Sequence, residues 1–288
     1  MIKFCNYLFL CLAILSISAR VYSGQSENLY TLQSTLISKA LFLDITYTGR
    51  QFVAVGERGH IVLSEKGETW KRASVPNDVT LTGVYFHNES LGWAVGHDAV
   101  IMKTDDGGQT WRTVFSAVEE EAPLLDIWFR NSMDGIAIGA YGLYLVTSDG
   151  GETWVRTDFS VIETQEENES AGSDDLAELY DLHLNSIENS PDGTLYIVAE
   201  AGRIYRSDDS GNSWRELHSP YIGSLFGILV VDSETLLVFG LRGHLYRSED
   251  AGQSWNQVSR LPLVMTGIAV SLMKKSVPSD PSIRVLMV

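Results

Sequence analysis

Eight residues, Thr147-Ser148-Asp149-Gly150-Gly151-Glu152-Thr153-Trp154, form the motif from which the architecture of this chain follows. Four other stretches end in a similar way, and they are Ser64–Trp70, Thr104–Trp111, Ser207–Trp214 and Ser248–Trp255. From one tryptophan to the next, the separations along the chain are 41, 43, 60 and 41 residues. A recurring period of about 40 residues indicates a repeat protein in which each unit is one supersecondary structure.

The repeat extends upstream of each motif, where a short Gly-bearing link separates two apolar runs. These links are 55–59, 95–99, 138–142, 198–202 and 239–243, and in the fourth Ala199 replaces the first glycine. Two apolar runs joined by such a link predict a β-hairpin. A further apolar stretch opens each unit, at 42–47, 82–86, 124–129, 180–187 and 225–231, and a short segment follows each tryptophan. Four strands per unit predict an all-β fold, a β-propeller of four-stranded blades.

The motif has a local structural logic, since Asp and Ser/Thr side chains bond to turn backbone and Gly tolerates positive φ. We therefore interpret the motif acids as structural, and expect each tryptophan to bury its ring between blades. The residues concerned are Asp106, Trp111, Asp149, Trp154, Asp209, Trp214, Asp250 and Trp255. The first motif is one residue shorter and lacks the Asp, so we expect a looser turn at 64–67.

These residues give the chain a resemblance to the BNR/Asp-box propellers, and within them to the photosystem II stability and assembly factor family. The cues are the Val-Gly-x-x-Gly links, the motif at 104–111, and Leu-Gly-Trp-Ala-Val-Gly at 91–96. The resemblance implies a non-enzymatic scaffold that binds a partner protein, with no catalytic residue, cofactor or metal. It also implies an arginine-rich face. The candidate partner-binding residues are Arg58, Arg203, Arg206, Arg242 and Arg247.

Composition limits the partners. Of the 288 residues, 44% are hydrophobic and 20% charged, which is enough apolar material for a packed core. The formal net charge of −16 disfavours binding to nucleic acid or to anionic lipid, and leaves cationic partners open.

The N-terminal segment 1–23 resembles a signal peptide: Lys3 precedes an apolar run of 14 residues. We expect a periplasmic or secreted monomer whose mature part, 24–288, is one propeller domain binding an envelope protein without inserting into the membrane. An uncleaved anchor is the alternative. Both cysteines, Cys5 and Cys11, lie in this segment, so the mature chain would have no disulfide and no thiol chemistry.

Two regions depart from the repeat. The segment 158–178 is an acidic insertion: from Asp158 to Asp181 there are nine acidic residues and no basic one. It is interpreted as a tolerated surface loop or as a docking loop for a basic partner. The tail at 261–288 has apolar runs but no motif. We therefore expect five full blades plus an incomplete sixth, in a family type of six or seven blades.

Two other functions remain open. Glycoside hydrolases and sialidases also carry Asp boxes, and a glycosidase needs two carboxylates facing one sugar site. A sialidase needs arginines around the substrate carboxylate and a tyrosine nucleophile, and the candidate residues for either enzyme are Arg58, Arg242, Tyr141, Glu200 and Asp126. For a metal site the candidates are Asp105–Asp106 and Asp208–Asp209, but the alternating ligands of a calcium loop are missing. His60 and His244 share one repeat position, which favours a role in the repeat over metal ligation.

Overall fold

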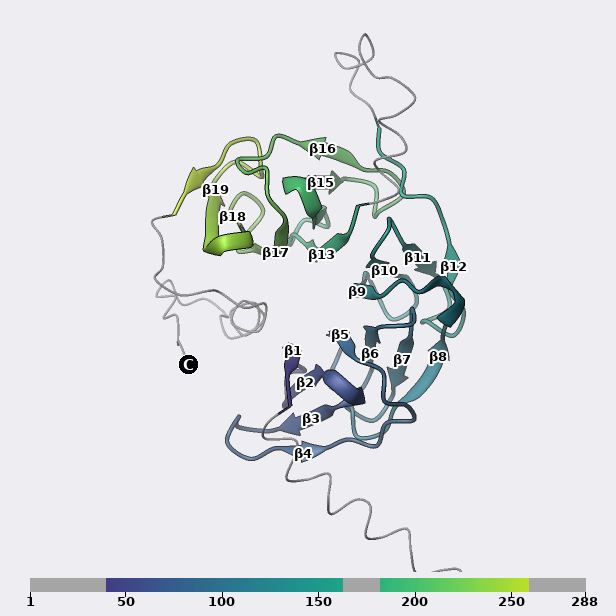
Figure 1. The fold of residues 1–288 in the computed structure, drawn as a ribbon. Helices are drawn as coiled ribbons and strands as arrows, with labels where there is room; N and C mark the ends of the chain where they lie inside the picture. The colour runs from purple at the N-terminus through teal and green to yellow at the C-terminus, as the bar shows by residue number, and fades with distance from the viewer. Residues whose placement is uncertain (1–39, 163–181, 259–288) are drawn as a thin grey trace, which may run out of the picture. The chain divides into compact units, whose positions relative to one another are not determined.

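The computed structural model describes residues 40–162 and 182–258, which form five four-stranded antiparallel sheets (Figure 1). Sheet one contains β1 (Phe42–Tyr47), β2 (Phe52–Gly56), β3 (Ile61–Ser64) and β4 (Lys71–Arg72). Sheet two contains β5 (Leu81–Phe86), β6 (Gly92–Gly96), β7 (Ile101–Thr104) and β8 (Arg112–Phe115). Sheet three contains β9 (Leu124–Phe129), β10 (Gly135–Gly139), β11 (Tyr144–Thr147) and β12 (Val155–Arg156). Sheet four contains β13 (Leu184–Asn189), β14 (Leu195–Ala199), β15 (Ile204–Ser207) and β16 (Arg215–Leu217). Sheet five contains β17 (Leu225–Val230), β18 (Leu236–Gly240), β19 (His244–Ser248) and β20 (Asn256–Gln257).

The sheets are the blades of a β-propeller, as the repeat predicts. The first strand of each blade contacts the first strand of the next, from β1 to β5, β9, β13 and β17. All five of these strands contribute side chains to one central cavity. The expected fold class is therefore confirmed for five blades. The segment 1–23, the incomplete sixth blade at 261–288 and most of the insertion 158–178 lie outside the described residues.

The predicted strand boundaries agree with the structure to within about one residue, except in the fourth blade. There β13 begins at Leu184, not at 180, and its pairing starts with Leu184 opposite Ala199. His183 lies just outside the ladder, where its backbone N–H donates to the Glu200 carboxylate at 3.4 Å, as that of Leu41 donates to Glu57 in the first blade. Within the described residues no helix is long and apolar enough to cross a membrane.

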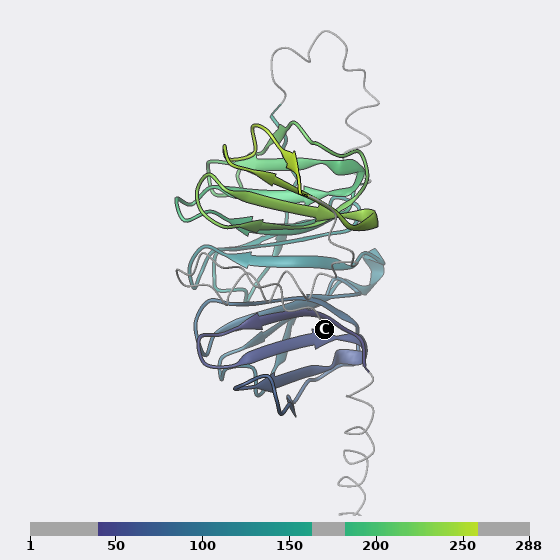
Figure 2. The same ribbon diagram turned by 90° about the vertical axis from the view of Figure 1, so that its left-hand side faces the viewer.

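The links between second and third strands form tight turns that contain two successive residues at positive φ. In the first blade these are Arg58 (φ 55°) and Gly59 (φ 63°), and in the fifth Arg242 (φ 63°) and Gly243 (φ 72°). Three of the links include a short 3-10 turn, named η1 (Glu57–Gly59), η3 (Glu200–Gly202) and η4 (Leu241–Gly243); η2 (Val118–Glu120) precedes β9. We call this end of the blades the loop face. It comprises 57–60, 97–100, 140–143, 200–203 and 241–243 with the segments that lead into the first strands. In Figure 2 the short helical turns lie along the right-hand edge.

The Asp-box motifs connect third and fourth strands at the opposite end, which we call the box face. In the third box, Asp149 Oδ1 accepts hydrogen bonds from the N–H groups of Glu152 and Thr153, both at 3.0 Å. Its Oδ2 accepts the Thr153 hydroxyl at 2.6 Å, and the Thr147 hydroxyl donates to Oδ1 at 2.8 Å. Asp106, Asp209 and Asp250 likewise accept the hydroxyl of the residue two positions before and the N–H and hydroxyl of the residue four positions after.

Box tryptophans pack between consecutive blades. Trp111 is buried with Val53 and Leu63 of the first blade, and its ring meets Phe86 edge-on at 5.9 Å. Trp154 and Trp214 are buried at the next two interfaces, and Trp255 is partly buried at the fourth. Each interface also has a hydrogen bond from the earlier blade to the next box. For example, the Trp93 indole N–H donates to the Gly150 carbonyl at 3.1 Å.

The first box differs, as its shorter sequence predicts. Ser64 Oγ still accepts the N–H of Gly67 at 2.8 Å, but no carboxylate closes the turn. The Trp70 side chain is 39% exposed, whereas Trp214 is 1% exposed. Within the described residues no blade precedes the first one, so this box lacks the partner that the other boxes dock on.

Replacing Asp149 with Ala should lower the free energy of unfolding by about 2 kcal/mol, because the turn N–H groups and two hydroxyls lose a charged acceptor. The hydrogen bonds from the Thr153 side chain and backbone lower the pKa of Asp149 to about 2. Since the unfolded carboxyl titrates near ~3.9, this stabilisation is complete above that pH and disappears as the pH falls toward 2. Thermal unfolding of wild type and Asp149→Ala at pH 7 and pH 2.5 measures both effects. An equal difference between the two proteins at both pH values would contradict the assignment.

Candidate functional site

The five candidate arginines lie at two different ends of the blades. Arg58 and Arg242 occupy the same turn position on the loop face, and both side chains are exposed. The backbone of Arg203 also lies on the loop face, directly after η3, but the Arg203 guanidinium forms an ion pair with Glu216 at 2.7 Å. No ion pair of Arg58 or Arg242 occurs within residues 40–162 and 182–258. These two are therefore the arginines most available to a partner.

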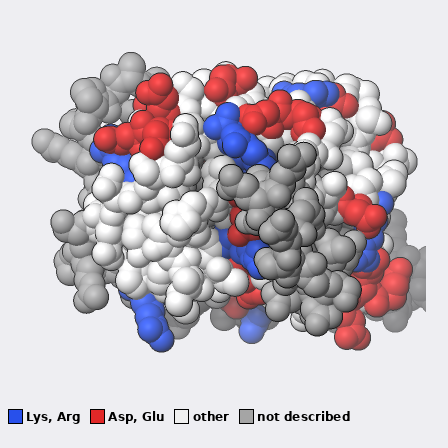
Figure 3. All heavy atoms as spheres, turned by 90° about the horizontal axis from the view of Figure 1, so that it is seen from above, with Lys and Arg blue, Asp and Glu red and all other residues white. Residues whose placement is uncertain are grey.

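Arg206 and Arg247 lie near the box face, where each pairs with an acid of its own box. Arg206 contacts Asp208 at 2.7 Å, and Arg247 contacts Glu249 at 3.0 Å. Figure 3 shows acidic and basic side chains next to one another on the face that it draws. The repeat assigns Arg58 and Arg242 to the links and Arg206 and Arg247 to the third strands, but the sequence does not show which of them form ion pairs. The structure does not bring them together into one surface.

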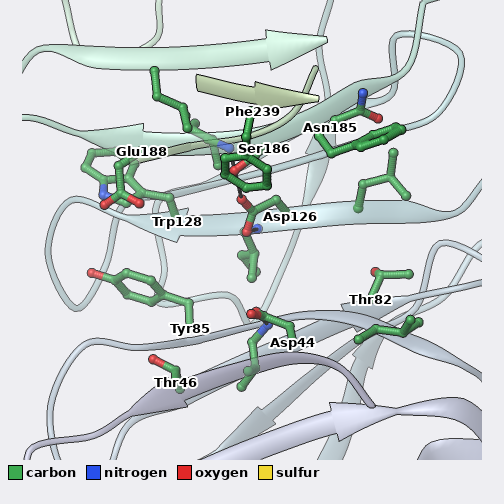
Figure 4. Close-up of a pocket in the computed structure, with 18 residues that line it drawn as sticks. Asp44, Thr46, Thr82, Tyr85, Asp126, Trp128, Asn185, Ser186, Glu188 and Phe239 are labelled. Atoms are coloured by element: carbon green, nitrogen blue, oxygen red, sulfur yellow. Dashed lines mark hydrogen bonds between the residues drawn. The ribbon is translucent and has the colours of Figure 1, made fainter. Parts of the chain in front are cut away.

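The central cavity, of about 180 Å³, is lined by residues of the first strands of all five blades (Figure 4). Each of these strands carries a β-bulge near its start, at Leu43, Thr82, Leu125, Asn185 and Phe226. The bulge residues lie at the loop-face end of the cavity. Three residues further along, the cavity is lined by Thr46, Tyr85, Trp128 and Glu188.

Polar side chains around this cavity link each blade to the next in two alternating ways. In the first and third blades an aspartate accepts backbone N–H groups of the following blade: Asp44 from Val84 at 2.9 Å, and Asp126 from Ile187 at 2.9 Å. In the second and fourth blades the bulge side chain donates to a carbonyl of the following blade. Thr82 bonds Leu124 O at 2.6 Å, and Asn185 bonds Leu225 O at 2.8 Å. Residue type and position change from blade to blade, so no repeat signal could reveal these links.

The glycosidase candidates occupy structural positions. Asp126 accepts three hydrogen bonds, from the backbone of Ile127 and from Ser186 Oγ and the Ile187 N–H of the next blade. Glu200 contacts the backbone and ring of His183, the ring at 3.5 Å. Tyr141 meets the His183 ring edge-on at 5.0 Å. The structure thus brings Tyr141 and Glu200 to one histidine on the loop face, and places Asp126 in the cavity.

The candidate metal ligands likewise have structural partners inside their own repeat units. Nowhere in the described part of the chain do three or more His, Cys, Asp or Glu side chains gather in a way that could hold a metal ion. Asp106 and Asp209 are bonded within their own boxes, while Asp208 pairs with Arg206 and Arg215. His60 is buried, and burial lowers its pKa. His244 lies at the same turn position and contacts Tyr221 and Gln257.

Comparison with known proteins identifies the relatives of this chain. A family model described as photosynthesis system II assembly factor YCF48 matches residues 62–214 and 114–263. The chloroplastic photosystem II stability/assembly factor HCF136 of Cyanidioschyzon merolae is 26% identical over 118 residues. That alignment covers 35% of this chain and 27% of the relative, so the match spans about a quarter of the relative's length.

Solved structures share the fold. YCF48 from Cyanidioschyzon merolae superposes with a TM-score of 0.50 at 15% identity, over 76% of this chain and 85% of that one. A GH74 enzyme of Niastella koreensis superposes with a TM-score of 0.56 at 14% identity, over 75% of this chain and 38% of that one. At such low identity both show the propeller alone. The family match covers most of the chain and agrees with its Val-Gly-x-x-Gly links and Asp boxes, so this protein belongs to the family of photosynthesis system II assembly factor YCF48.

Proposed function

We propose that this protein is an exported, non-enzymatic scaffold that binds a partner protein of the cell envelope through its loop face. The observation that carries the proposal is the distribution of exposed apolar side chains. Six large ones lie on the loop face: Leu41, Val118, Tyr141, Ile222, Phe226 and Leu241. The box face has four, Trp70, Met133, Val155 and Val231, fewer than the loop face, where Ile222 is the most exposed of all at 93%. Exposed apolar side chains that gather on one face are typical of an interaction surface.

Membership of an assembly-factor family supports a binding role over a catalytic one. The cavity carboxylates of Asp44 and Asp126 accept hydrogen bonds from backbone N–H groups of neighbouring blades, which gives them a structural role in joining the blades. The two exposed arginines of the loop face, Arg58 and Arg242, add charged contacts beside the apolar residues. Export is proposed from the sequence of residues 1–23 alone.

Site-specific photocrosslinking in the native cell tests this function. A photoreactive phenylalanine analogue replaces Ile222, which is 93% exposed on the loop face, or Met133, which is 49% exposed on the box face. A discrete crosslinked species at Ile222 and none at Met133 is the expected outcome. Equal crosslinking at both positions would reject the loop face as the docking surface. Turnover of aryl glycosides or sialosides by the purified protein would reject the non-enzymatic role.

Exchanging Arg58 and Arg242 together for Gln should leave folding unchanged and weaken partner binding. Both side chains are exposed, and such surface substitutions change stability by about 0.5 kcal/mol or less. The loss of two interfacial charges should reduce crosslinking at Ile222 several-fold, and more strongly at low salt. Arg206→Gln with Arg247→Gln is the matched control, because these two arginines lie near the box face. Unfolding midpoints and crosslink yields of both pairs are compared.

A further inference from the structure

The first Asp box, in the turn between β3 and β4, keeps the hydrogen-bond donors of the motif but has no acceptor for them. In the second box, Asp106 accepts the Thr110 N–H at 3.0 Å, the Thr110 hydroxyl at 2.7 Å and the Thr104 hydroxyl at 2.9 Å. Thr69 and Ser64 stand at the places of Thr110 and Thr104, but no residue of the first box stands at the place of Asp106. The groups that surround a carboxylate in the other boxes therefore occur here without one.

The rest of this turn is built as in the other boxes. Gly67 has a positive φ of 77° and donates its N–H to Ser64 Oγ at 2.8 Å, and the Trp70 indole N–H donates to the Gly67 carbonyl at 3.2 Å. The second box contains the same two hydrogen bonds, at 3.0 and 2.8 Å. Thr69 is exposed, and neither its N–H nor its hydroxyl has a hydrogen-bond partner within residues 40–162 and 182–258. The Thr69 donors are thus held in a box-like turn and are available to an external acceptor.

A cavity of about 520 Å³ lies beside this turn, between the first and second boxes, and Ser64 and Thr69 are part of its lining. Three exposed basic side chains also line it: Arg50, Lys66 and Lys71. None of the three forms an ion pair with any residue in the described part of the chain. An anion placed against the Ser64 and Thr69 donors would therefore have basic side chains around it.

Acidic side chains in the same lining limit the charge of that anion. They are Glu65, Glu68, Glu89 and Asp106, so the lining has no excess of positive charge. The hydrogen-bond donors must then supply the attraction, and an anion with one negative charge is repelled less by the acids than one with two. This balance favours a carboxylate over phosphate or sulfate.

The box donors stabilise the ionised form of a carboxylate where one is present. Hydrogen bonds from the Ser254 side chain and backbone lower the pKa of Asp250 to about 2. Thr153 has the same effect on Asp149 in the third box. Hydrogen bonds to an ionised acceptor are about twice as strong as those between neutral groups. The same pair of donors in the first box can act on a carboxylate that comes from outside.

We propose that the first box binds a carboxylate group of another molecule in the place that the box aspartate occupies in the other four blades. The Thr69 N–H, the Thr69 hydroxyl and the Ser64 hydroxyl donate to this group, and Lys66 pairs with its charge. The carboxylate comes from an acidic side chain of a protein segment or from a free small acid. The site belongs to the box face, so it is separate from the docking surface proposed on the loop face.

NMR titration at pH 7 and constant ionic strength tests this site. The probes are acetate, phosphate, the peptide acetyl-Gly-Ser-Asp-Ser-Gly-amide and its asparagine counterpart. The aspartate peptide should shift the Thr69 amide signal and saturate with a Kd of roughly 1–10 mM, while the asparagine peptide and phosphate should bind at least about tenfold more weakly. The Thr110 amide, which is bonded to Asp106, should not shift. Acetate as tight as the aspartate peptide would identify a free acid as the ligand, and weaker acetate binding a protein segment.

Three variants make the test specific. Thr69→Ala removes one donor and should weaken binding of the aspartate peptide about tenfold, and Lys66→Gln should weaken it about threefold. Arg247→Gln, an equal loss of charge at an exposed residue near the box face of the fifth blade, should leave it unchanged.

The third variant completes the box. Replacing Glu65-Lys66 with Asp-Asp-Gly, the sequence of residues 105–107, supplies the missing acceptor. This variant should no longer bind the peptide, and it should unfold at a higher temperature than wild type because its box donors are bonded internally. Equal binding of the aspartate and asparagine peptides, an unchanged affinity in Thr69→Ala, or full binding by the completed box would overturn the proposal.

Discussion

Trp214→Ala is expected to lower the free energy of unfolding by about 3–5 kcal/mol, the usual cost of removing a large buried aromatic side chain. Trp214 is 1% exposed and lies between the third and fourth blades. Its ring packs against Phe159 at 5.7 Å and Tyr144 at 6.4 Å. Truncation would leave a cavity at an interface between two sheets, where neither blade can move inward without breaking its contacts with the next one.

Trp70→Ala is the matched control, since it removes the same side chain from the same motif position. Trp70 is 39% exposed, and its box faces no described blade. The loss should be below about 1 kcal/mol, in the range of ordinary surface substitutions. Urea unfolding followed by tryptophan fluorescence measures both variants. Equal losses would mean that residues outside 40–162 and 182–258 bury Trp70 as deeply as the other box tryptophans.

The blades could be predicted because the residues that build them recur. Four of the five boxes place their tryptophan at an interface between blades, and every Gly-bearing link has residues at positive φ, so the signal repeats about every 40 residues. The apolar run predicts too early a start for the fourth blade, whereas the spacing from first strand to box tryptophan that the second, third and fifth blades share places it at Leu184. The apolar run there begins at Tyr180, but the ladder begins at Leu184, where the Glu200 side chain takes the N–H of the preceding residue.

The cavity could not be predicted, because the residues that line it do not recur from blade to blade. Asp44, Thr82, Asp126 and Asn185 perform one task, the joining of consecutive first strands, with three kinds of side chain at two different strand positions. Asp126 was a glycosidase candidate from its residue type alone. Its bonds to Ser186 and Ile187 of the next blade show a role in joining blades, which only the fold reveals. Glu188 and Trp128 carried no signal in the sequence, because each stands at a repeat position that other blades fill differently.

In the third blade, the end of β10 lies so close to the backbone at the start of β9 that Gly139→Ala should strongly lower the stability of the protein. A Cβ atom at Gly139 would lie 2.3 Å from the Pro123 carbonyl oxygen and 2.9 Å from the Leu124 Cα. Both neighbours are backbone, held by the hydrogen bond from the Ala140 N–H to Pro123 O at 3.0 Å, so no side chain can turn away. Because the clash can be relieved only by moving β9 away from β10, the free energy of unfolding should fall by about 3 kcal/mol.

The control for this variant is already present in the chain. The fourth blade has Ala199 at the equivalent register position, opposite the first paired residue of β13, and its side chain is buried. Ala199→Gly should cost only about 1–2 kcal/mol, through one lost buried methyl group and the greater backbone entropy of glycine. Thermal unfolding compares the two: the midpoint should be roughly 6–12 °C lower for Gly139→Ala and roughly 2–8 °C lower for Ala199→Gly. If the unfolding temperature of Gly139→Ala is no lower than that of Ala199→Gly, β9 and β10 are not packed closely enough to bring a Cβ atom at residue 139 within 2.3 Å of the Pro123 carbonyl oxygen. The recurrence of glycine at this position in four of the five links would then need another cause than this backbone contact.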